Sequence, residues 1–322
     1  MAQETVTVSV ATYNSAKFII ETLDSVAEQT YPNIELLISD DCSSDDTIGL
    51  CREWLNRHKH RFIQSDLFTV SSNTGVSANV NRCLNAATSQ WIKLLAGDDI
   101  LLPNCIEDNV KYITAHPGIA VVFSQVLLYK NEFNEENFIK PSPAIFPNNL
   151  MREDLNSNSQ YKLLLLSDRI NYTPSVFLKK EIVLAVGGFD ETIKLVEDYP
   201  MWLKLTKAGH KLHYFHTPTV GYRQHEAAVN NMKEEGLFKP LFLKSWPLHK
   251  KYIYPNIPWD LAWDYRFVFF ISHLFQMFGL NRKGAFNSFL YKGATVYMNP
   301  LKYVIFFKKR LLGYEKNNIF YK

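Results

Sequence analysis

The chain has 322 residues, of which 47% are hydrophobic and 21% are charged. This length and balance fit one large α/β domain plus a smaller appendage, and they exclude wholesale disorder. The four cysteines form no CxxC and no metal-type spacing with histidines, so free thiols in a reducing compartment are expected, and residues 1–5 show no signal-peptide pattern.

From residue 5 to about 222, strand and helix patterns alternate, which favours a mostly parallel sheet flanked by helices. Strands are predicted at 5–11, 34–38, 67–71, 91–95, 119–129, 211–215 and 219–222. Helices are predicted at about 18–26, 45–58 and 76–88, from Pro103 onwards, and from Glu197 to Gly209. The polar segment 130–158 is expected to be a loop or an excursion over the site.

Charge divides the chain into two differently built parts. Residues 1–239 contain 22 basic and 29 acidic residues, a balance of −7, whereas residues 240–322 contain 13 basic and three acidic residues, a balance of +10. The second part also holds 22 of the 45 aromatic residues. We therefore predict a first domain at 1–235 and a C-terminal helical extension at 236–322.

Three acidic pairs carry most of the functional information: Asp40-Asp41, Asp98-Asp99 and Glu197-Asp198. The first two directly follow predicted buried strands, which places them at the edge where open α/β sheets bind ligands. Adjacent carboxylates repel each other unless a cation or hydrogen-bond donors offset the repulsion. A divalent metal that carries a phosphorylated ligand is the economical explanation.

Each pair also has a structural interpretation as a helix cap or an Asx turn, because Asp readily takes both roles. For one isolated pair that interpretation is preferred. Three pairs in one chain shift the balance towards a ligand site.

Five motifs stand in a fixed order: VSVATYN at 8–14, SDDCSSDDT at 39–47, GDD at 97–99, GGFD at 187–190 and EDY at 197–199. This order and spacing resemble family 2 of the glycosyltransferases, over about residues 4–226. The resemblance implies the GT-A fold and an inverting transfer of a sugar from a nucleotide-sugar donor, a UDP-sugar in this chain, to a glycan acceptor.

The resemblance also implies individual donor and metal contacts. Thr12, Tyr13 and Asn14 would border the uracil and ribose, and Asp41 would accept a hydrogen bond from the base. Asp98 would contact the ribose or support the metal shell, and Asn81 would lie on the donor side. Asp99 would ligate Mn²⁺ or Mg²⁺ bound to the diphosphate, with His225 close to the metal.

On the acceptor side, the resemblance implies that Asp198 is the general base, with Glu197 and Arg223 beside it. A carboxylate within hydrogen-bond reach of the acceptor hydroxyl would take its proton during attack, a contribution of about 10²–10⁴-fold. Asp198 opens a predicted helix, whose dipole is expected to lower the pKa of the carboxyl and keep it ionised.

The chain departs from the family pattern in three places. Gly97 precedes Asp98, so the metal motif is not a strict Asp-x-Asp. Val80 stands where relatives often have Arg, with Asn81 and Arg82 following, so a basic donor contact would come from elsewhere. The Gln-x-x-Arg-Trp motif of processive synthases is absent from the sequence, which favours transfer of a single sugar per encounter.

The C-terminal extension has two interpretations. Its most apolar stretch, 267–280, is shorter than the roughly 20 residues that span a bilayer. A helical subdomain with its own aromatic core is one interpretation. The other is a peripheral surface at the inner face of the plasma membrane, where Lys302 and residues 308–310 attract anionic lipid and neighbouring aromatics enter the interface. This would suit a lipid-linked acceptor.

The sequence thus predicts a cytoplasmic, metal-dependent, inverting glycosyltransferase of bacterial surface polysaccharide synthesis, with no nucleic-acid partner because no such motif is visible. A non-catalytic sugar-nucleotide or glycan-binding module is one alternative. A nucleotidyltransferase is another, although no Gly-rich phosphate loop supports it. A dinucleotide-binding dehydrogenase lacks its GxGxxG after the first strand.

Overall fold

The computed structural model describes residues 4–193, 196–225, 236–238, 240–311 and 320. The described chain forms two compact units, one of residues 1–161 and 169–228 and the other of residues 162–168 and 229–322. The boundary predicted at residue 235 lies outside the described residues, so the division into 1–235 and 236–322 stays a prediction.

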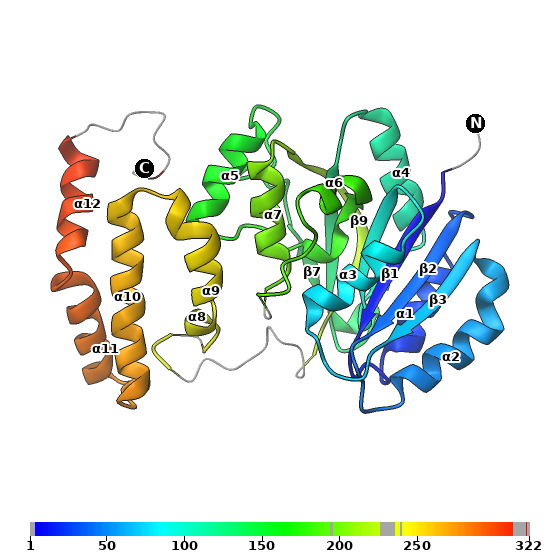
Figure 1. Cartoon of the computed structure of the whole chain (residues 1–322), viewed down its shortest axis with the longest axis horizontal. Helices are drawn as coiled ribbons and strands as arrows, with labels where there is room; N and C mark the ends of the chain where they lie inside the picture. Colours follow the sequence, from blue (N-terminus) through cyan, green and yellow to red (C-terminus); the bar gives the residue numbers. More distant parts are fainter. Residues whose placement is uncertain (1–3, 194–195, 226–235, 239, 312–319, 321–322) are drawn as a thin grey trace. The chain divides into compact units, whose positions relative to one another are not determined.

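The first unit is built on a nine-stranded mixed sheet in the order β3-β2-β1-β4-β8-β6-β9-β5, with β7 paired to β6. Figure 1 shows β1, β2 and β3 side by side in this sheet. The strands are β1 (Val6–Thr12), β2 (Ile34–Asp40), β3 (Gln64–Thr69), β4 (Trp91–Ala96), β5 (Ile100–Leu101), β6 (Val121–Lys130), β7 (Phe138–Ser142), β8 (Phe177–Lys179) and β9 (Leu212–Gln224). The first four pair in parallel, and β6 pairs in parallel with β9. The α/β prediction is confirmed.

Helices connect these strands: α1 (Ile19–Ala27), α2 (Thr47–His58), α3 (Val76–Ala86), α4 (Cys105–Ala115), α5 (Ser157–Leu166), α6 (Lys180–Ala185) and α7 (Asp198–Lys207). All seven residues of β2 are buried, as expected of a strand covered on both faces. From α1, Ile19, Leu23 and Val26 are fully buried, which is the apolar stripe predicted from their helical spacing. This core fixes the strand ends that carry the acidic pairs.

Two local predictions were wrong. The segments 211–215 and 219–222 are one 13-residue strand, β9, because a register shift opposite Gln125 accommodates Pro218, which has no N–H to donate. The segment 130–158 is not all loop, because β7 within it pairs antiparallel with β6.

The second unit is helical, as predicted for the C-terminal extension: α8 (Pro240–Lys244), α9 (Trp246–Leu248), α10 (Trp259–Met277), α11 (Ala285–Lys292) and α12 (Pro300–Leu311), with wider π turns at His249–Ile253 and Gly293–Tyr297. Buried Leu248, Ile253, Leu261 and Phe275 contribute to its core. None of the helices in the described part of the chain has the length and apolar character needed to cross a bilayer.

Candidate active site

The Asp98-Asp99 pair lies in the short turn between β4 and β5, at the carboxyl end of β4. Gly97 precedes it because the neighbouring strand leaves no room for a side chain: a Cβ there would come within 2.9 Å of Thr12 Cγ2 and 3.0 Å of Ser15 Oγ. The missing acidic residue of the Asp-x-Asp pattern is thus explained by close packing between the turn and the end of β1.

Pairing of β5 with β9 brings the end of β9 to this turn. The main-chain N–H of Arg223 donates to Asp99 Oδ1 at 2.9 Å, and Arg223 Nε donates to the carbonyl of Asp98 at 2.7 Å. His225 Nε2 lies 3.0 Å from Asp98 Oδ2. Four residues predicted for the site, whose contacts join positions 124 to 127 apart in the chain, therefore form one cluster.

The guanidinium of Arg223 is enclosed and is not free to meet a substrate. Only 2% of the Arg223 side chain is exposed. Its charge lies 4.4 Å from the ring centre of Phe18 and 4.1 Å from that of Phe133, and it also pairs with Glu21 and donates to the carbonyl of Asn131. Arg223 thus joins α1, the carboxylate turn, the loop after β6 and β9.

The two carboxylates of the turn face different surroundings. Burial, followed by the neighbouring charge of Asp98, raises the pKa of Asp99 well above its ordinary value, and the Arg223 N–H opposes this increase. Asp99 is only 1% exposed, whereas the Asp98 side chain is 32% exposed and His225 is 13% exposed. A cation bound here would favour the charged form that burial opposes in Asp99.

Among the described residues, no group of three or more His, Cys, Asp or Glu side chains forms a ready-made metal cage. Magnesium sites that act on phosphates commonly use one or two carboxylates, with the substrate phosphates and water completing the shell. The partly exposed Asp98 carboxylate, with Asp99 behind it and His225 beside it, fits such a partial donor set.

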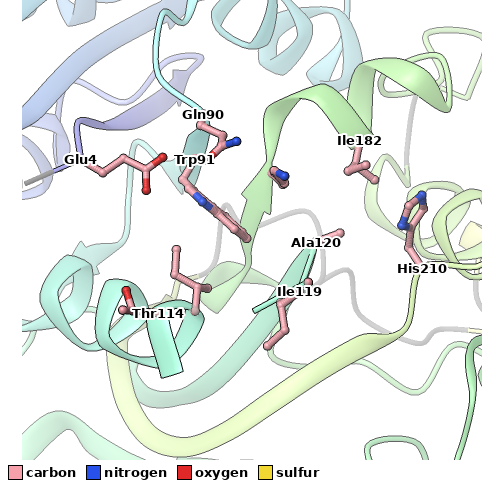
Figure 2. A pocket seen from close by; sticks show the side chains of 11 residues that line it. Glu4, Gln90, Trp91, Thr114, Ile119, Ala120, Ile182 and His210 are labelled. Atoms are coloured by element: carbon pink, nitrogen blue, oxygen red, sulfur yellow. The ribbon is translucent and has the colours of Figure 1, made fainter. Parts of the chain in front are cut away.

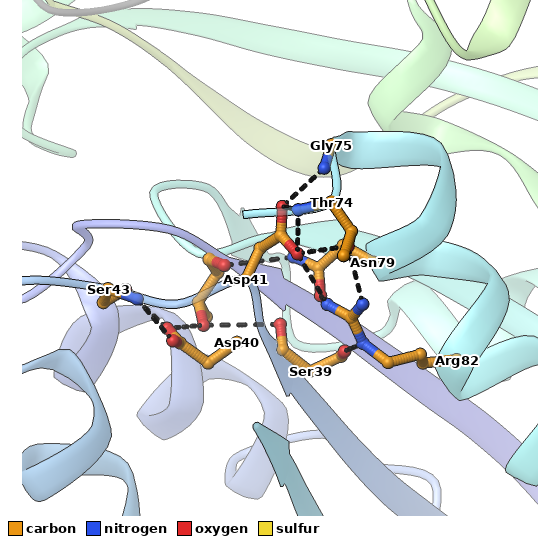
Figure 3. A network of polar contacts seen from close by, with 9 residues as sticks. Ser39, Asp40, Asp41, Ser43, Thr74, Gly75, Asn79 and Arg82 are labelled. Carbon is orange, nitrogen blue, oxygen red and sulfur yellow. Dashed lines mark hydrogen bonds and ion pairs between the residues drawn. The ribbon is translucent and has the colours of Figure 1, made fainter. Parts of the chain in front are cut away.

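Asp41 lies in a dense polar network (Figure 3). Its carboxylate accepts hydrogen bonds from the Thr74 N–H and hydroxyl, from the Gly75 N–H at 2.7 Å and from Arg82 Nη2 at 2.9 Å. These bonds lower the pKa of Asp41 and outweigh burial, the largest single contribution, which acts in the opposite direction. Asp41 is 2% exposed, so its present bonds hold the loop before α3 to the end of β2.

Arg82 is the basic residue of this network. Besides Asp41, Arg82 donates to Ser39 Oγ, Thr74 Oγ1 and Asn79 Oδ1. The Asn79 amide in turn donates to the carbonyl of Thr12 at 3.0 Å. A basic residue one position after the predicted contact Asn81 was the available sequence signal for this role.

Hydrogen bonds join the end of β1 and the residues after it to the end of β2 and to the loop that follows β2. The Thr12 hydroxyl donates to Asp40 Oδ2 at 2.8 Å, and the Asn14 side-chain oxygen accepts from the Ser44 N–H at 2.8 Å. Tyr13 is 52% exposed. The structure thus places an exposed ring between two anchored neighbours, which suits a residue that borders a ligand.

Asn81 holds another segment in place. Its amide donates to the carbonyl of Phe189 at 2.9 Å and to Glu191 Oε1 at 2.8 Å, and its oxygen accepts from the Phe189 N–H. Gly188 has φ +62° and lies against Asn81, where a Cβ would come within 3.0 Å of Asn81 Oδ1. The GGFD motif therefore packs on α3, and the Asn81 side chain is committed to that contact.

Asp198 is the first residue of α7, as predicted, and Glu197 precedes it. Asp198 Oδ2 accepts a hydrogen bond from the Thr173 hydroxyl at 2.8 Å, and Oδ1 accepts one from the Tyr199 N–H at 2.7 Å. Thr173 is 25 positions away, and no sequence pattern pointed to it.

The prediction that the helix terminus lowers the pKa of Asp198 was wrong. Shielding from solvent raises the pKa of Asp198 despite bonds from the Thr173 hydroxyl and main-chain N–H groups. The same shielding, with the Asp198 charge as the second cause, raises the pKa of Glu197 to about 7. The dipole effect, typically 0.3–1 kcal/mol at exposed sites, is smaller than the desolvation of adjacent carboxyls.

A hollow of about 260 Å³ lies elsewhere in the first unit (Figure 2). Trp91, Ile119, Lys179 and His210 are among its lining residues. Trp91 begins β4, and His210 precedes β9. The hollow therefore lies at the amino ends of these strands, whereas the Asp98-Asp99 turn lies at the carboxyl end of β4. None of the predicted site residues lines it.

The chain is 23% identical over 280 residues to the uncharacterized glycosyltransferase MJ1057 of Methanocaldococcus jannaschii, an alignment that covers 85% of this chain and 89% of the relative. It is 28% identical over 170 residues to the poly(ribitol-phosphate) beta-N-acetylglucosaminyltransferase TarS of Staphylococcus aureus, covering 52% of this chain and 29% of TarS.

Solved structures support the fold. TarS 1–349 of S. aureus in complex with UDP-GlcNAc has a TM-score of 0.55 at 18% identity, covering 84% of this chain and 73% of that one. The mannosyltransferase PcManGT of Pyrobaculum calidifontis, in complex with GDP-Man and Mn²⁺, has a TM-score of 0.52 at 17% identity, covering 97% and 77%.

The family model described as "Glycosyl transferase family 2" matches residues 7–172, just over half of the chain, and this span includes the first two acidic pairs. Together with the mixed sheet and the acidic turn after β4, this match shows that the chain belongs to glycosyl transferase family 2 and is a glycosyltransferase of GT-A fold.

Proposed function

We propose that the protein transfers a single sugar from a nucleotide-sugar donor, a UDP-sugar, to a glycan acceptor with inversion at the anomeric carbon and with the help of a divalent metal. The observation that carries this proposal is the cluster of Asp98, Asp99, Arg223 and His225 at the carboxyl end of β4. The TarS neighbour in complex with UDP-GlcNAc supports the choice of a uridine nucleotide.

In the proposed reaction, the acceptor hydroxyl oxygen attacks the anomeric carbon and forms the new glycosidic bond. The hydroxyl proton passes to Asp198. The bond between the anomeric carbon and the diphosphate oxygen breaks, and its electron pair leaves with the nucleoside diphosphate. One displacement inverts the centre, so one general base suffices and no covalent enzyme intermediate forms.

Asp98 and Asp99, with His225 close by, would hold Mn²⁺ or Mg²⁺ together with the donor diphosphate. When bound, the cation would stabilise the charge of the leaving diphosphate as a Lewis acid. Arg223 stands behind this turn, so its predicted acceptor contact becomes a supporting role: its charge is enclosed by Phe18, Phe133 and Glu21.

Thr12, Tyr13 and Asn14 would border the base and ribose of the donor, where exposed Tyr13 is available for stacking. Asp41 would accept a hydrogen bond from the base in exchange for one of the donors that now occupy it. Asn81 would act on the donor side indirectly, by holding the GGFD segment against α3.

A screen of nucleotide sugars with Mn²⁺ or Mg²⁺ tests the proposal by the release of nucleoside diphosphate and by transfer to an acceptor. Release that requires both metal and acceptor is expected. Release of pyrophosphate would instead indicate a nucleotidyltransferase, and donor binding without any release would indicate a non-catalytic binding module.

The proposal extends to the setting: a lipid-linked acceptor of bacterial surface polysaccharide synthesis, at the inner face of the plasma membrane. The second unit supports contact with anionic lipid. Asp260 and Asp264 are the only acidic residues between 236 and 311, and both are buried against Lys308 and Lys302. Its exposed large apolar side chains include Trp263, Phe286 and Phe289.

Flotation with vesicles tests this contact. The protein is expected to float with anionic vesicles and less with neutral ones, because basic residues near anionic lipid each add about 1 kcal/mol. Serine in place of Phe289, which is 71% exposed, should weaken binding about tenfold. Serine in place of Phe138, which is 43% exposed in the first unit, is the matched control. An intact chain that does not float excludes the membrane contact.

A further inference from the structure

We propose that Thr173 is a positioning residue that makes Asp198, rather than the adjacent Glu197, the carboxylate that accepts the acceptor's proton. This inference rests on the proposed function, in which Asp198 is the general base. It adds a residue that lies just beyond the segment matched by the family model.

The geometry around Asp198 leaves it able to accept a proton. The Thr173 hydroxyl donates to Oδ2 at 2.8 Å and the Tyr199 N–H donates to Oδ1 at 2.7 Å, so a neutral donor reaches each oxygen. Each carboxylate oxygen can accept more than one hydrogen bond. The two donors therefore fix the orientation of the carboxylate and favour its charged form without filling it.

The turn that carries the Thr173 hydroxyl is held in place by buried groups. Thr173 begins a 3-10 turn, Thr173–Ser175, which contacts β4 and β6. The ammonium of Lys93, fully buried in β4, donates to the carbonyls of Pro174 and Val176. The Ser175 hydroxyl, also fully buried, accepts from the Ser124 N–H of β6 at 3.0 Å.

The bonds from Lys93 also connect the turn that carries Thr173 to the strand before the Asp98-Asp99 turn. Lys93 lies on β4, the strand that leads into the Asp98-Asp99 turn, five residues before Asp98. Burying an ammonium is unfavourable unless its donors are satisfied, so the carbonyls that Lys93 binds have little freedom to move. The 3-10 turn thus carries the Thr173 hydroxyl at a fixed place relative to β4.

A bond to only one member of the Glu197-Asp198 pair decides which of the two carboxyls ionises first. Two adjacent shielded carboxyls resist double ionisation, so the proton that remains is shared according to the bonds each group makes. Burial raises the pKa of both Glu197 and Asp198. The Thr173 bond lowers the pKa of Asp198 and thereby favours ionisation there first.

The test compares Thr173→Val, which removes the hydroxyl at nearly constant shape, with Thr173→Ser, which keeps it. Because the lost bond stabilised the charged form, Thr173→Val should raise the pKa of Asp198. The acidic limb of kcat/KM should move to higher pH by about one unit, with activity near pH 6 reduced about tenfold. Thr173→Ser should restore the wild-type profile, and the donor KM should change little in either variant.

Thermal unfolding of both variants, and of Thr173→Ala as a second deletion of the hydroxyl, separates this effect from loss of folding. A Thr173→Val or Thr173→Ala profile that superimposes on wild type overturns the inference, as does a Thr173→Ser profile that matches the deletions. If Asp198→Asn keeps full turnover, the proposed base fails, and the inference fails with it. If Asp198→Asn is inactive but the deletions leave the profile unchanged, only the role of Thr173 fails.

Discussion

Asp41 and Asp198 are both shielded carboxylates that stand next to a second acid, but the donors around them differ. Asp41 has a charged partner, Arg82, and further donors from Thr74 and Gly75, and its pKa is lowered although it is 2% exposed. Asp198 is bonded by neutral donors from Thr173 and Tyr199, and its pKa is raised. The balance between desolvation and the number and charge of the donors thus decides between a permanent charge and a proton acceptor.

Replacing Asp198 by Asn tests the proton-accepting side of this contrast most strongly. Transfer should fall by about 10²–10⁴-fold because the base is lost, while binding of the nucleoside diphosphate is retained. Steady-state transfer and calorimetric binding measure the two quantities. Glu197→Gln is the comparison variant and should lose less activity than Asp198→Asn; an equal loss in both variants would contradict the assignment of the base to Asp198.

Alanine in place of Asp98 or Asp99 tests whether the other acidic turn acts through a metal. Loss of one carboxylate should reduce metal-dependent kcat/KM by about 100-fold, because Lewis-acid stabilisation supplies several kcal/mol. Calorimetric titration of each variant with Mn²⁺ in the presence of UDP should show weaker metal binding than in wild type. Asp154→Ala, at a side chain that is 69% exposed, is the control. Unchanged metal titrations in both turn variants would refute the role.

Asparagine in place of Asp41 tests the permanently charged side. In this variant an NH₂ group replaces one carboxylate oxygen and faces the donors of Thr74 or Gly75, which then lose their acceptor. The variant should therefore lose about 1–3 kcal/mol of unfolding free energy. Denaturant unfolding measures this loss. Removal of the exposed Arg57 charge, whose side chain is 60% exposed and paired with Glu53, should change stability by less than about 1 kcal/mol. Equal losses would contradict the buried network.

The pH dependence of stability gives the smallest expected effect. The folded pKa of Asp41 is depressed, so its contribution is fully present above the unfolded value of about 4 and is lost as pH falls through the folded pKa. Arg82→Met removes one of the causes of this depression, so unfolding free energy should fall less steeply below about pH 4 than in wild type. Parallel curves for the two proteins would show that Arg82 does not set this pKa.

The sequence alone was enough to predict the α/β sheet, the family, the acidic turn after β4 and the start of α7 at Asp198. These features depend on local patterns: buried apolar strands, turn residues after them and helical spacing. It also placed Arg223 and His225 among the site residues, through the family resemblance. It did not show that Pro218 would be absorbed within one long strand, because that depends on the register against β6.

Only the tertiary structure decided what surrounds each carboxylate. The Arg82 partner of Asp41, the aromatic enclosure of Arg223 and the Thr173 bond to Asp198 all join residues far apart in the chain. The sign of a pKa shift depends on the balance between burial and these donors, and both terms are set by packing. For that reason the helix dipole alone predicted the wrong sign at Asp198: local sequence reports the dipole, but only the fold reports the desolvation that exceeds it.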